Sequence, residues 1–277
     1  MKKTFSLLFF ASVIWASAFS QGQINLTKGQ KYQVDSKVVT ASSTEVQGQT
    51  METNVDAASI YNIEVKDVTN DSYVLNNTLK SLKSSTSQMG QEMNFDSDKK
   101  DDMAGPIGTA LAGTINVPMS VVFSKNGTVI PDKAAKKSED KSMIARSVAT
   151  FEATGYGSQL AFIAIPASSK VGDTWTSTND TKDTKTTTNY TIKEINGDVV
   201  TLSISGTTSN DVTMENNGME LEIKTSGKFT GEEKVNSKTG VIQSSNTVTD
   251  ASGTVGAMGQ EFPSTTKVIT TTTVKML

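Results

Sequence analysis

Apolar and polar residues alternate in the stretch Ile60-Tyr61-Asn62-Ile63-Glu64-Val65-Lys66. Successive side chains of a β-strand point to opposite faces of the sheet, so Tyr61, Ile63 and Val65 share one face and the polar residues share the other. One apolar and one polar face are typical of a strand in an antiparallel sheet that is buried on one side. The same alternation recurs in residues 190–193, 200–204 and 219–223, and from Val268 onward. The chain is therefore predicted to be mainly β.

Short turn signals separate the alternating segments. Gly adopts the positive φ angles of tight hairpin turns, and Asn and Asp tolerate them. Such pairs occur at Asn70-Asp71, Asn126-Gly127, Asn196-Gly197, Asn217-Gly218 and Thr239-Gly240. We predict long antiparallel hairpins that form one curved sheet or two related β-lobes, with a few short helices in the middle of the chain.

Helical spacing is confined to the region between two β-rich halves. Residues 101–111 show it weakly, because Gly105 and Pro106 interrupt the segment. Residues 133–153 show it better, with apolar residues at positions i, i+4 and i+7. These two segments are the predicted helices.

The two β-rich halves match each other at three places that occur in the same order. Residues 28–32 match 171–175, residues 65–74 match 192–200, and residues 124–130 match 237–242. Antiparallel hairpins with similar turns also look alike by convergence, which is the alternative. We predict a duplication, with a signal peptide at 1–20, a first half at 21–132, a helical connector at 133–166 and a second half at 167–277.

The first 20 residues have the features of an export signal. Lys2 and Lys3 precede an apolar run over residues 5–19, and the small residues Ala18 and Ser20 suit cleavage before Gln21. The alternative is an N-terminal membrane anchor, but the run is shorter than the ~20 residues that span a bilayer. We expect a product without a transmembrane segment, exported to the periplasm or the extracellular space.

The composition excludes several classes of function. The chain contains no His and no Cys, which excludes Ser-His-Asp and Cys-His nucleophiles, disulfides and iron–sulfur clusters. Arg146 is the only arginine, and 26 Lys+Arg stand against 29 Asp+Glu, so no excess of positive charge favours nucleic acid. We predict no nucleic-acid partner, no cofactor and no enzymatic activity.

One element carries a resemblance to a known family. The stretch Ile165-Pro166, followed by Lys170-Val171-Gly172-Asp173-Thr174-Trp175, and the repeated Ser-Lys-x-Gly-x-Val/Ile turn are similar to secreted Bacteroidetes proteins known only as a domain of unknown function. The resemblance implies an exported envelope protein and transfers no catalytic residue. From the residues alone, Gly172 permits a tight turn, Asp173 accepts hydrogen bonds from its backbone, and Trp175 is expected to anchor core packing.

Two constellations suggest chemistry, and each has a simpler explanation. Asp96, Asp98, Asp101 and Asp102 form an acidic run that resembles a weak calcium site. The run lacks the Gly and the distal Glu of an EF-hand loop, and a solvated turn before a helix explains it equally well. Ser138-Glu139-Asp140-Lys141, Ser177-Thr178-Asn179 and Lys238-Thr239-Gly240 imitate the motifs of penicillin-recognising enzymes, but a chain rich in Ser and Thr produces such triplets by chance.

Met residues stand beside Gly at four predicted hairpin tips. Met is flexible, and Met-rich surfaces suit adaptable apolar contacts. The alternative is that these residues face the core at the strand ends. The candidate ligand-binding residues are Met51, Met89, Met93, Met214, Met219, Met258 and Phe262.

The sequence predicts a non-enzymatic cell-envelope protein that binds an unidentified hydrophobic ligand or protein partner. A periplasmic carrier that holds a lipid in an open half-barrel is the alternative. A hydrolase that uses carboxylates is the third possibility, since no one-dimensional spacing selects a pair of them.

Overall fold

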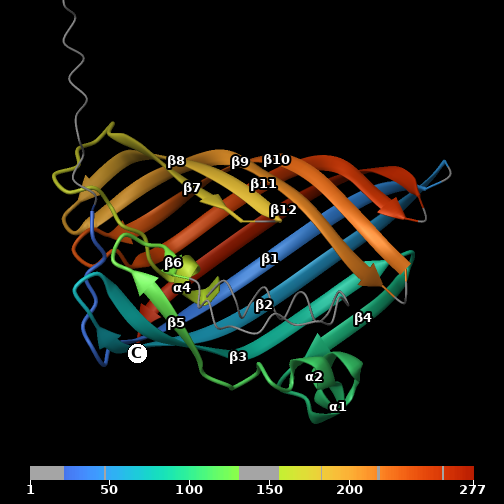
Figure 1. Ribbon diagram of the computed structural model, residues 1–277, viewed down its shortest axis with the longest axis horizontal. Helices are drawn as coiled ribbons and strands as arrows, with labels where there is room; N and C mark the ends of the chain where they lie inside the picture. Colours follow the sequence, from blue (N-terminus) through green and yellow to red (C-terminus); the bar gives the residue numbers. More distant parts are fainter. Residues whose placement is uncertain (1–21, 47, 131–155, 182, 217–218, 258) are drawn as a thin grey trace, which may run out of the picture.

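The computed structural model describes residues 22–46, 48–130, 156–181, 183–216, 219–257 and 259–277. The described chain forms one continuous antiparallel sheet of 12 strands, in the order β6-β5-β3-β2-β1-β12-β11-β10-β9-β8-β7, with β4 paired to β3 (Figure 1). Of the two architectures expected from the sequence, the single curved sheet is confirmed.

The strands are long hairpins, as the alternating pattern predicts. Those before the helical region are β1 (Lys31–Val46), β2 (Gln49–Val68), β3 (Ser72–Gln88), β4 (Gln91–Asp96), β5 (Met119–Ser124) and β6 (Val129–Ile130). Those after it are β7 (Thr174–Asp180), β8 (Thr184–Asn196), β9 (Val199–Asn216), β10 (Met219–Asn236), β11 (Ile242–Ala257) and β12 (Gln260–Met276).

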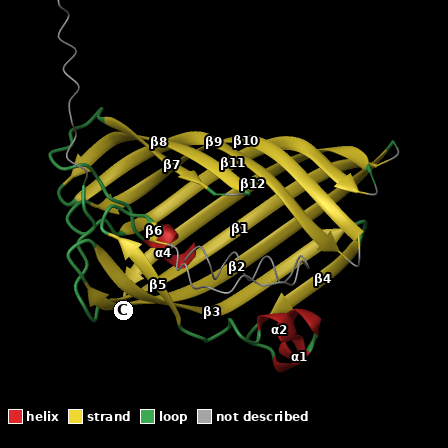
Figure 2. Cartoon of the chain, viewed as in Figure 1, coloured by secondary structure: helices red, strands yellow, loops and turns green. Residues whose placement is uncertain are grey.

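Three short helices accompany the sheet in the described residues. The predicted segment 101–111 forms α1 (Lys100–Ala104) and α2 (Pro106–Leu111), which Gly105 separates. The helix α4 (Tyr156–Ala161) lies within the curve of the sheet, whereas α1 and α2 lie beside the end of β4 (Figure 2). The helix predicted over residues 133–153 lies outside the described residues. No described helix is long and apolar enough to cross a membrane.

The core occupies one end of the inner face of the sheet. In the first part of the chain it comprises the inner faces of β1, β2, β3 and β5 together with Phe162. In the second part it is smaller and includes Ile192, Leu202 and Val235.

The helix α4 covers the inner face of the first part. A Cβ atom on Gly157 would lie 3.1 Å from the ring of Tyr61, so the helix lies directly on that ring. The Ser158 hydroxyl donates a hydrogen bond to Asn77 Oδ1 at 3.0 Å. Just beyond the helix, Phe162 packs edge-on against Tyr32, with ring centroids 5.3 Å apart. The helix α4 and Phe162 therefore cover the inner face of the first part of the sheet.

The strand order of the first part recurs in the second. Strands β1-β2-β3-β5-β6 and β7-β8-β9-β10-β11 follow one another in the sheet in the same way, with β12 between β1 and β11. The Gly29 N–H donates to the Val65 carbonyl at 2.8 Å, and the Gly172 N–H donates to the Ile192 carbonyl at the same distance. Each of these contacts lies beside a register shift, at 65/67 and at 192/194. The predicted boundaries of the two halves stay a prediction.

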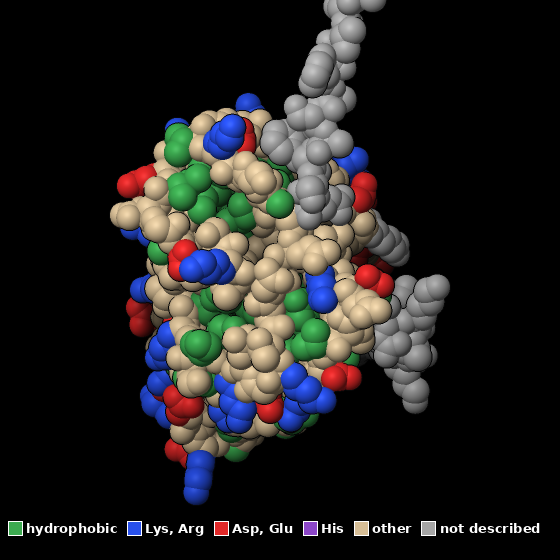
Figure 3. Space-filling model, turned by 90° about the vertical axis from the view of Figure 1, so that its left-hand side faces the viewer, with side chains coloured by type: hydrophobic (Ala, Val, Ile, Leu, Met, Phe, Trp, Pro, Cys, Tyr) green, Lys and Arg blue, Asp and Glu red, His purple; other side chains and the backbone are tan. Residues whose placement is uncertain are grey.

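The segment before β1 lies between two turns, the one that joins β5 to β6 and the one that joins β10 to β11. The Ile24 N–H donates to the Lys125 carbonyl at 2.8 Å, and the Asn25 N–H donates to the Thr239 carbonyl at 3.0 Å. The end of the sheet that contains these turns is viewed in Figure 3, where apolar side chains lie among Lys and acidic side chains. Exposed apolar residues near this end include Val68, Val171, Ile195, Met276 and Leu277.

Glycine permits close packing on the inner face of the second part. A Cβ atom on Gly206 would lie 2.5 Å from the ring of Phe229 and 2.0 Å from the Thr187 carbonyl oxygen. Only Gly accommodates the aromatic ring at this position, because any side chain would displace it. The ring of Phe229 therefore lies across the neighbouring strand.

Candidate ligand-binding site

A cavity of about 740 Å³ lies between α4 with the segment that follows it and the strands β7 and β8. The turn between β5 and β6 also borders it, so both edges of the sheet contribute to its wall. Small-molecule sites typically have volumes of ~300–1,000 Å³. The cavity is thus large enough for a small organic ligand.

Two stacked aromatic side chains form one wall of the cavity. Trp175 of β7 pairs in register with Tyr190 of β8, so both side chains point to the inner face. Their ring centroids lie 4.9 Å apart and their planes differ by 14°. Burial raises the pKa of the Tyr190 phenol, and the charge of Glu233 raises it further. The phenol therefore stays neutral across the physiological range and acts as a hydrogen-bonding group.

Glu233 of β10 contributes a carboxyl group to the same cavity. It shares the inner face with Val235, which is fully buried two residues further along the strand. The Ser245 hydroxyl donates a hydrogen bond to Glu233 Oε1 at 3.2 Å. Burial raises the pKa of Glu233 to about 7, although the hydrogen bond from Ser245 lowers it. The carboxyl group is thus close to half-ionised at neutral pH.

The second carboxyl oxygen of Glu233 has no hydrogen-bond partner. Four buried side-chain atoms of the described residues lack one, namely Tyr61 Oη, Asn62 Oδ1, Asn77 Nδ2 and Glu233 Oε2. Glu233 is the carboxylate among them, and it is the member of this set that lines the cavity. A buried carboxyl oxygen without a hydrogen-bond partner lowers the stability of the protein. Glu233 Oε2 is therefore the most unusual polar atom of this site.

The remaining lining combines an apolar and a polar side. Phe162, Ile163 and Pro166 lie on the side of α4, whereas β7 and β8 contribute hydroxyl and amide groups. Among the described lining residues, Glu233 is the single acidic one, and neither Lys nor Arg is present. Glycoside hydrolysis commonly uses two carboxylates, and this lining supplies one. The arrangement can hold a ligand by apolar contact and hydrogen bonding.

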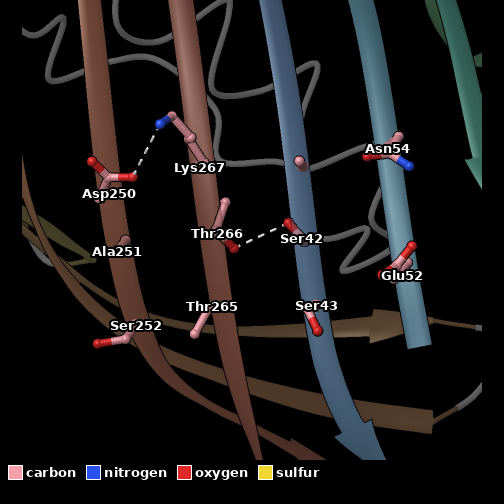
Figure 4. A pocket seen from close by; sticks show the side chains of 11 residues that line it. Ser42, Ser43, Glu52, Asn54, Asp250, Ala251, Ser252, Thr265, Thr266 and Lys267 are labelled. Carbon is pink, nitrogen blue, oxygen red and sulfur yellow. Dashed lines mark hydrogen bonds and ion pairs between the residues drawn. The ribbon is translucent and has the colours of Figure 1, made fainter. Parts of the chain in front are cut away.

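A second hollow, of about 550 Å³, lies along β1, β2, β11 and β12 (Figure 4). The hydroxyls of Ser42 and Thr266 lie 3.0 Å apart, and Lys267 Nζ lies 3.9 Å from Asp250 Oδ1. Its described lining contains no aromatic side chain and none of the four unpartnered buried atoms, so it forms a less distinctive site than the cavity beside β7.

The structure places the predicted Met hairpins at one end of the sheet, away from the core (Figure 1). The register brings neighbouring tips together, since it pairs Thr53 with Gln88, Thr44 with Ser264, and Leu221 with Ala257. These pairs join the four hairpins β1–β2, β3–β4, β9–β10 and β11–β12.

The candidate residues at these tips differ in exposure. Met89 and Met93 are 73% and 57% exposed, whereas Met51 and Phe262 are half-buried. Met214 lies two residues before the end of β9, Met219 is the first residue of β10, and Met258 lies outside the described residues. Ligand binding by these residues stays a prediction.

The acidic run is occupied by protein contacts. Lys83 Nζ lies 3.2 Å from Asp96 Oδ2 and 3.1 Å from Asp98 Oδ2. The Asp96 N–H donates to Asp102 Oδ2 at 2.7 Å, and Asp101 is exposed in the first turn of α1. Within the described part of the chain, no group of three or more Asp or Glu residues could hold a metal ion. These contacts match the explanation of the run as a turn before a helix, although no side chain caps α1.

The described residues do not bring together the three motifs that resemble those of penicillin-recognising enzymes. Ser138 and Lys141 lie outside them, and Lys238-Thr239-Gly240 forms the turn between β10 and β11. In that turn, Lys238 Nζ forms an ion pair with Asp198 at 2.7 Å.

Sequence reasoning missed Glu233 and Tyr190 as site residues and assigned Trp175 to the core. Trp175 does pack against the smaller core cluster, but it is half-buried and also lines the cavity. A signal for Glu233 was present, because Phe229, Glu233 and Val235 are separated by even numbers of residues in one strand and so share a face.

Comparison with known proteins identifies a family but no activity. The family model described as "Family of unknown function (DUF6263)" matches residues 70–242, more than half of the chain. A search of curated proteins found no match.

Solved structures resemble the chain only distantly. A chain from a structure of lipid–protein interactions in lipovitellin aligns with a TM-score of 0.49 and 8% identity, over 91% of this chain and 26% of that one. This chain thus spans about a quarter of that protein's length. An outer membrane channel from Pseudomonas putida F1 aligns with a TM-score of 0.28 and 8% identity, over 91% of this chain and 98% of that one. These scores are too low to assign a shared fold or function.

Proposed function

We propose that this chain, which belongs to the family of unknown function DUF6263, is a non-enzymatic binding protein that holds a small organic ligand in the cavity beside β7 and β8. The unpartnered Oε2 atom of Glu233, set in a cavity with a stacked aromatic wall, is the observation that carries the proposal. A buried carboxyl group without a partner lowers stability, and a ligand that donates a hydrogen bond to it removes that penalty.

The chemistry of the lining supports binding more than catalysis. Glu233 is the one carboxylate among the described lining residues, and the chain contains no His or Cys. A raised carboxyl pKa also occurs in catalytic acids, but such an acid needs a second group to stabilise or attack the reacting centre. A hydrolase is therefore the weaker candidate.

A hydrophobic cargo is the second candidate for this cavity. Phe162, Ile163 and Pro166 offer an apolar surface, which suits an acyl chain or another lipid. The opposite wall carries Ser, Thr and Asn side chains, which favour a ligand with polar groups. We therefore place a lipid carrier second.

Export belongs to the same proposal. Residues 1–20 have the composition of a signal peptide, and the chain has no Cys to carry a lipid anchor. The expected mature protein begins at Gln21 and is released into the periplasm or the medium. Intact-mass analysis of protein from its native host tests this point, and a product that retains residues 1–20 would contradict it.

Trp175 gives the binding proposal a direct readout. The chain has two Trp residues, Trp15 and Trp175, so a product that begins at Gln21 fluoresces from Trp175 alone. Protein from the native host should release a small organic compound on extraction, identified by mass spectrometry, and adding the compound back should change Trp175 emission in a saturable way. A compound that binds without changing Trp175 emission, or the absence of any bound compound together with no response to a ligand library, would refute the proposal.

A further inference from the structure

We propose that the ligand of this cavity is an organic cation, a primary or secondary amine whose N–H group donates to the Glu233 carboxylate while its apolar body lies against Trp175 and Tyr190. This inference rests on the proposed binding function and specifies the chemical class of its ligand.

The carboxyl group of Glu233 lacks a compensating positive charge. Its partners in register, Leu202 on β9 and Ser245 on β11, are uncharged, and the phenol of Tyr190 is the titratable group that faces it from β8. The segment 159–166 contains no charged residue. An ionised carboxylate in this setting is therefore unpaired, and a buried unpaired charge is strongly unfavourable.

The charged neighbours of Glu233 in its own strand do not relieve this imbalance. Glu232 and Lys234 are adjacent in sequence, so their side chains point to the outer face of the sheet, where both are exposed. An amine ligand supplies a positive charge and an N–H donor at once. It would satisfy the free Oε2 atom by a charge-assisted hydrogen bond.

The aromatic wall favours the same class of ligand. The stacked rings of Trp175 and Tyr190 line the same cavity as the carboxyl group of Glu233. Aromatic faces attract organic cations, and aromatic rings also bury the apolar body of a ligand. An anion would meet the charge of Glu233 without any Lys or Arg in the described lining to offset it.

Cation binding must be coupled to the protonation of Glu233. Burial raises the pKa of this carboxyl group to about 7, so it is mostly neutral below that pH. An aliphatic amine stays charged well above pH 8, since the Lys side chain titrates at about 10.4. The ionised fraction of Glu233 rises about tenfold between about pH 6 and pH 8, and the affinity for an amine should rise by the same factor. A neutral ligand should show no such increase.

Three matched probes test the charge requirement on the chain that begins at Gln21. Phenethylamine is the cation, phenethyl alcohol is its neutral counterpart, and hydrocinnamate is the anion. Trp175 emission and isothermal titration calorimetry in buffers of different ionisation enthalpy measure affinity and the protons released. We expect phenethylamine to bind most tightly and to release a proton near pH 6.

Two variants of the same strand separate the carboxyl group from general effects of charge. Glu233→Gln keeps the shape of the side chain and should weaken phenethylamine binding at least tenfold, whereas the affinity for phenethyl alcohol, which carries no charge, should change much less. Glu232→Gln removes a charge from the outer face and should leave the affinity for all probes unchanged. Thermal melting of both variants confirms that each is folded.

The outcomes distinguish the two proposals. Equal affinity for phenethylamine and phenethyl alcohol, or an unchanged affinity for phenethylamine in Glu233→Gln, overturns the cation assignment while small-molecule binding stands. Phenethylamine failing to bind while a native neutral ligand does bind overturns it as well. If no probe binds and no native ligand is extracted, both the cation assignment and the binding function fail.

Discussion

The two halves of the sheet share one strand order but differ in what lies on the inner face. In the first half, α4 and Phe162 cover the inner face and the core is continuous. In the second half the core is smaller, and the cavity lies beside it. The same backbone plan thus supports a closed interior in one half and a binding cavity in the other.

The strand register identifies the positions at which the halves differ. Reading across three strands, one row is Val65, Leu75 and Val121, and the corresponding row is Ile192, Leu202 and Glu233. Val121 is buried and apolar, whereas Glu233 is an acid. The buried position that the apolar Val121 occupies in the first half is therefore occupied by the titratable Glu233 in the second half.

The aromatic residues show the same divergence. Tyr32 pairs with Ile63 in the first half, and Trp175 pairs with Tyr190 in the second. Tyr32 is 2% exposed beneath Phe162, but Trp175 remains half-buried at the cavity. The side chains that fill the inner face, more than the order of the strands, therefore determine where a ligand can enter.

Truncating these two aromatic side chains should lower the free energy of unfolding by different amounts. Replacing Tyr32 by Ala should lower the free energy of unfolding by about 3–5 kcal/mol, because it leaves a cavity in a closed core. Replacing Trp175 by Ala should lower it by only roughly 1–2 kcal/mol, although the side chain is larger, because it is only partly buried. Urea unfolding measures both values. An equal or greater loss for Trp175 would mean that the second half is packed as tightly as the first.

The next effect concerns Glu233 and the pH dependence of stability. Its pKa in the folded protein, about 7, lies above the ordinary value of the unfolded chain. The folded state therefore holds the proton more tightly, and stability contributed by this group is present at low pH and lost as the pH rises through about 4.5 to 7. At about pH 8 the loss should approach about 3 kcal/mol, because the group is then ionised in both the folded and the unfolded chain.

Glu233→Gln should remove this part of the pH dependence. Its free energy of unfolding relative to the wild type should increase between about pH 5 and pH 8, measured by urea titration at each pH. Glu232→Gln, on the exposed face of the same strand, is the matched control and should follow the wild type. Parallel curves for the wild type and Glu233→Gln would show that the carboxyl group is not desolvated.

A smaller effect tests whether the two halves share their local geometry. Gly29 and Gly172 precede equivalent strands with φ angles of 89° and 92°. Ala at either position should cost about 1–2 kcal/mol, because a Cβ atom disfavours this left-handed conformation. Equal losses in the two variants, measured by urea unfolding, would support the equivalence. A loss of stability at only one of the two positions would contradict the equivalence.

Much of this comparison was visible in the sequence. The alternation in residues 60–66 predicted the strand, and the match of residues 28–32 with 171–175 predicted that Tyr32 and Trp175 take corresponding places. Glu233 was missed because it stands in the polar run Glu232-Glu233-Lys234, where only its even spacing from Val235 indicates the inner face.

The closure of the first half could not be predicted from the sequence. The predicted helical connector at 133–166 includes α4, but residues 156–161 contain Gly157 and show no extended helical periodicity that would locate the helix there. Its place depends on contacts with Tyr61 and Asn77, which are distant in sequence. The cavity is what α4 and its following segment leave open, and a one-dimensional pattern does not contain that information.

The smallest expected effect on stability compares the two ends of the sheet. Met89 and Met93 are exposed at the hairpin tips, and Met276 is 64% exposed at the end that contains the core. Changing Met89 and Met93 to Ser should alter the free energy of unfolding by less than about 0.5 kcal/mol, because exposed side chains contribute little packing. If the tips bind apolar partners, the double variant should also lose binding of a fluorescent hydrophobic probe, whereas Met276→Ser should retain it. Equal losses in the two variants would show general exposure of Met rather than a binding surface, and a large fall in melting temperature would assign the tip residues to packing.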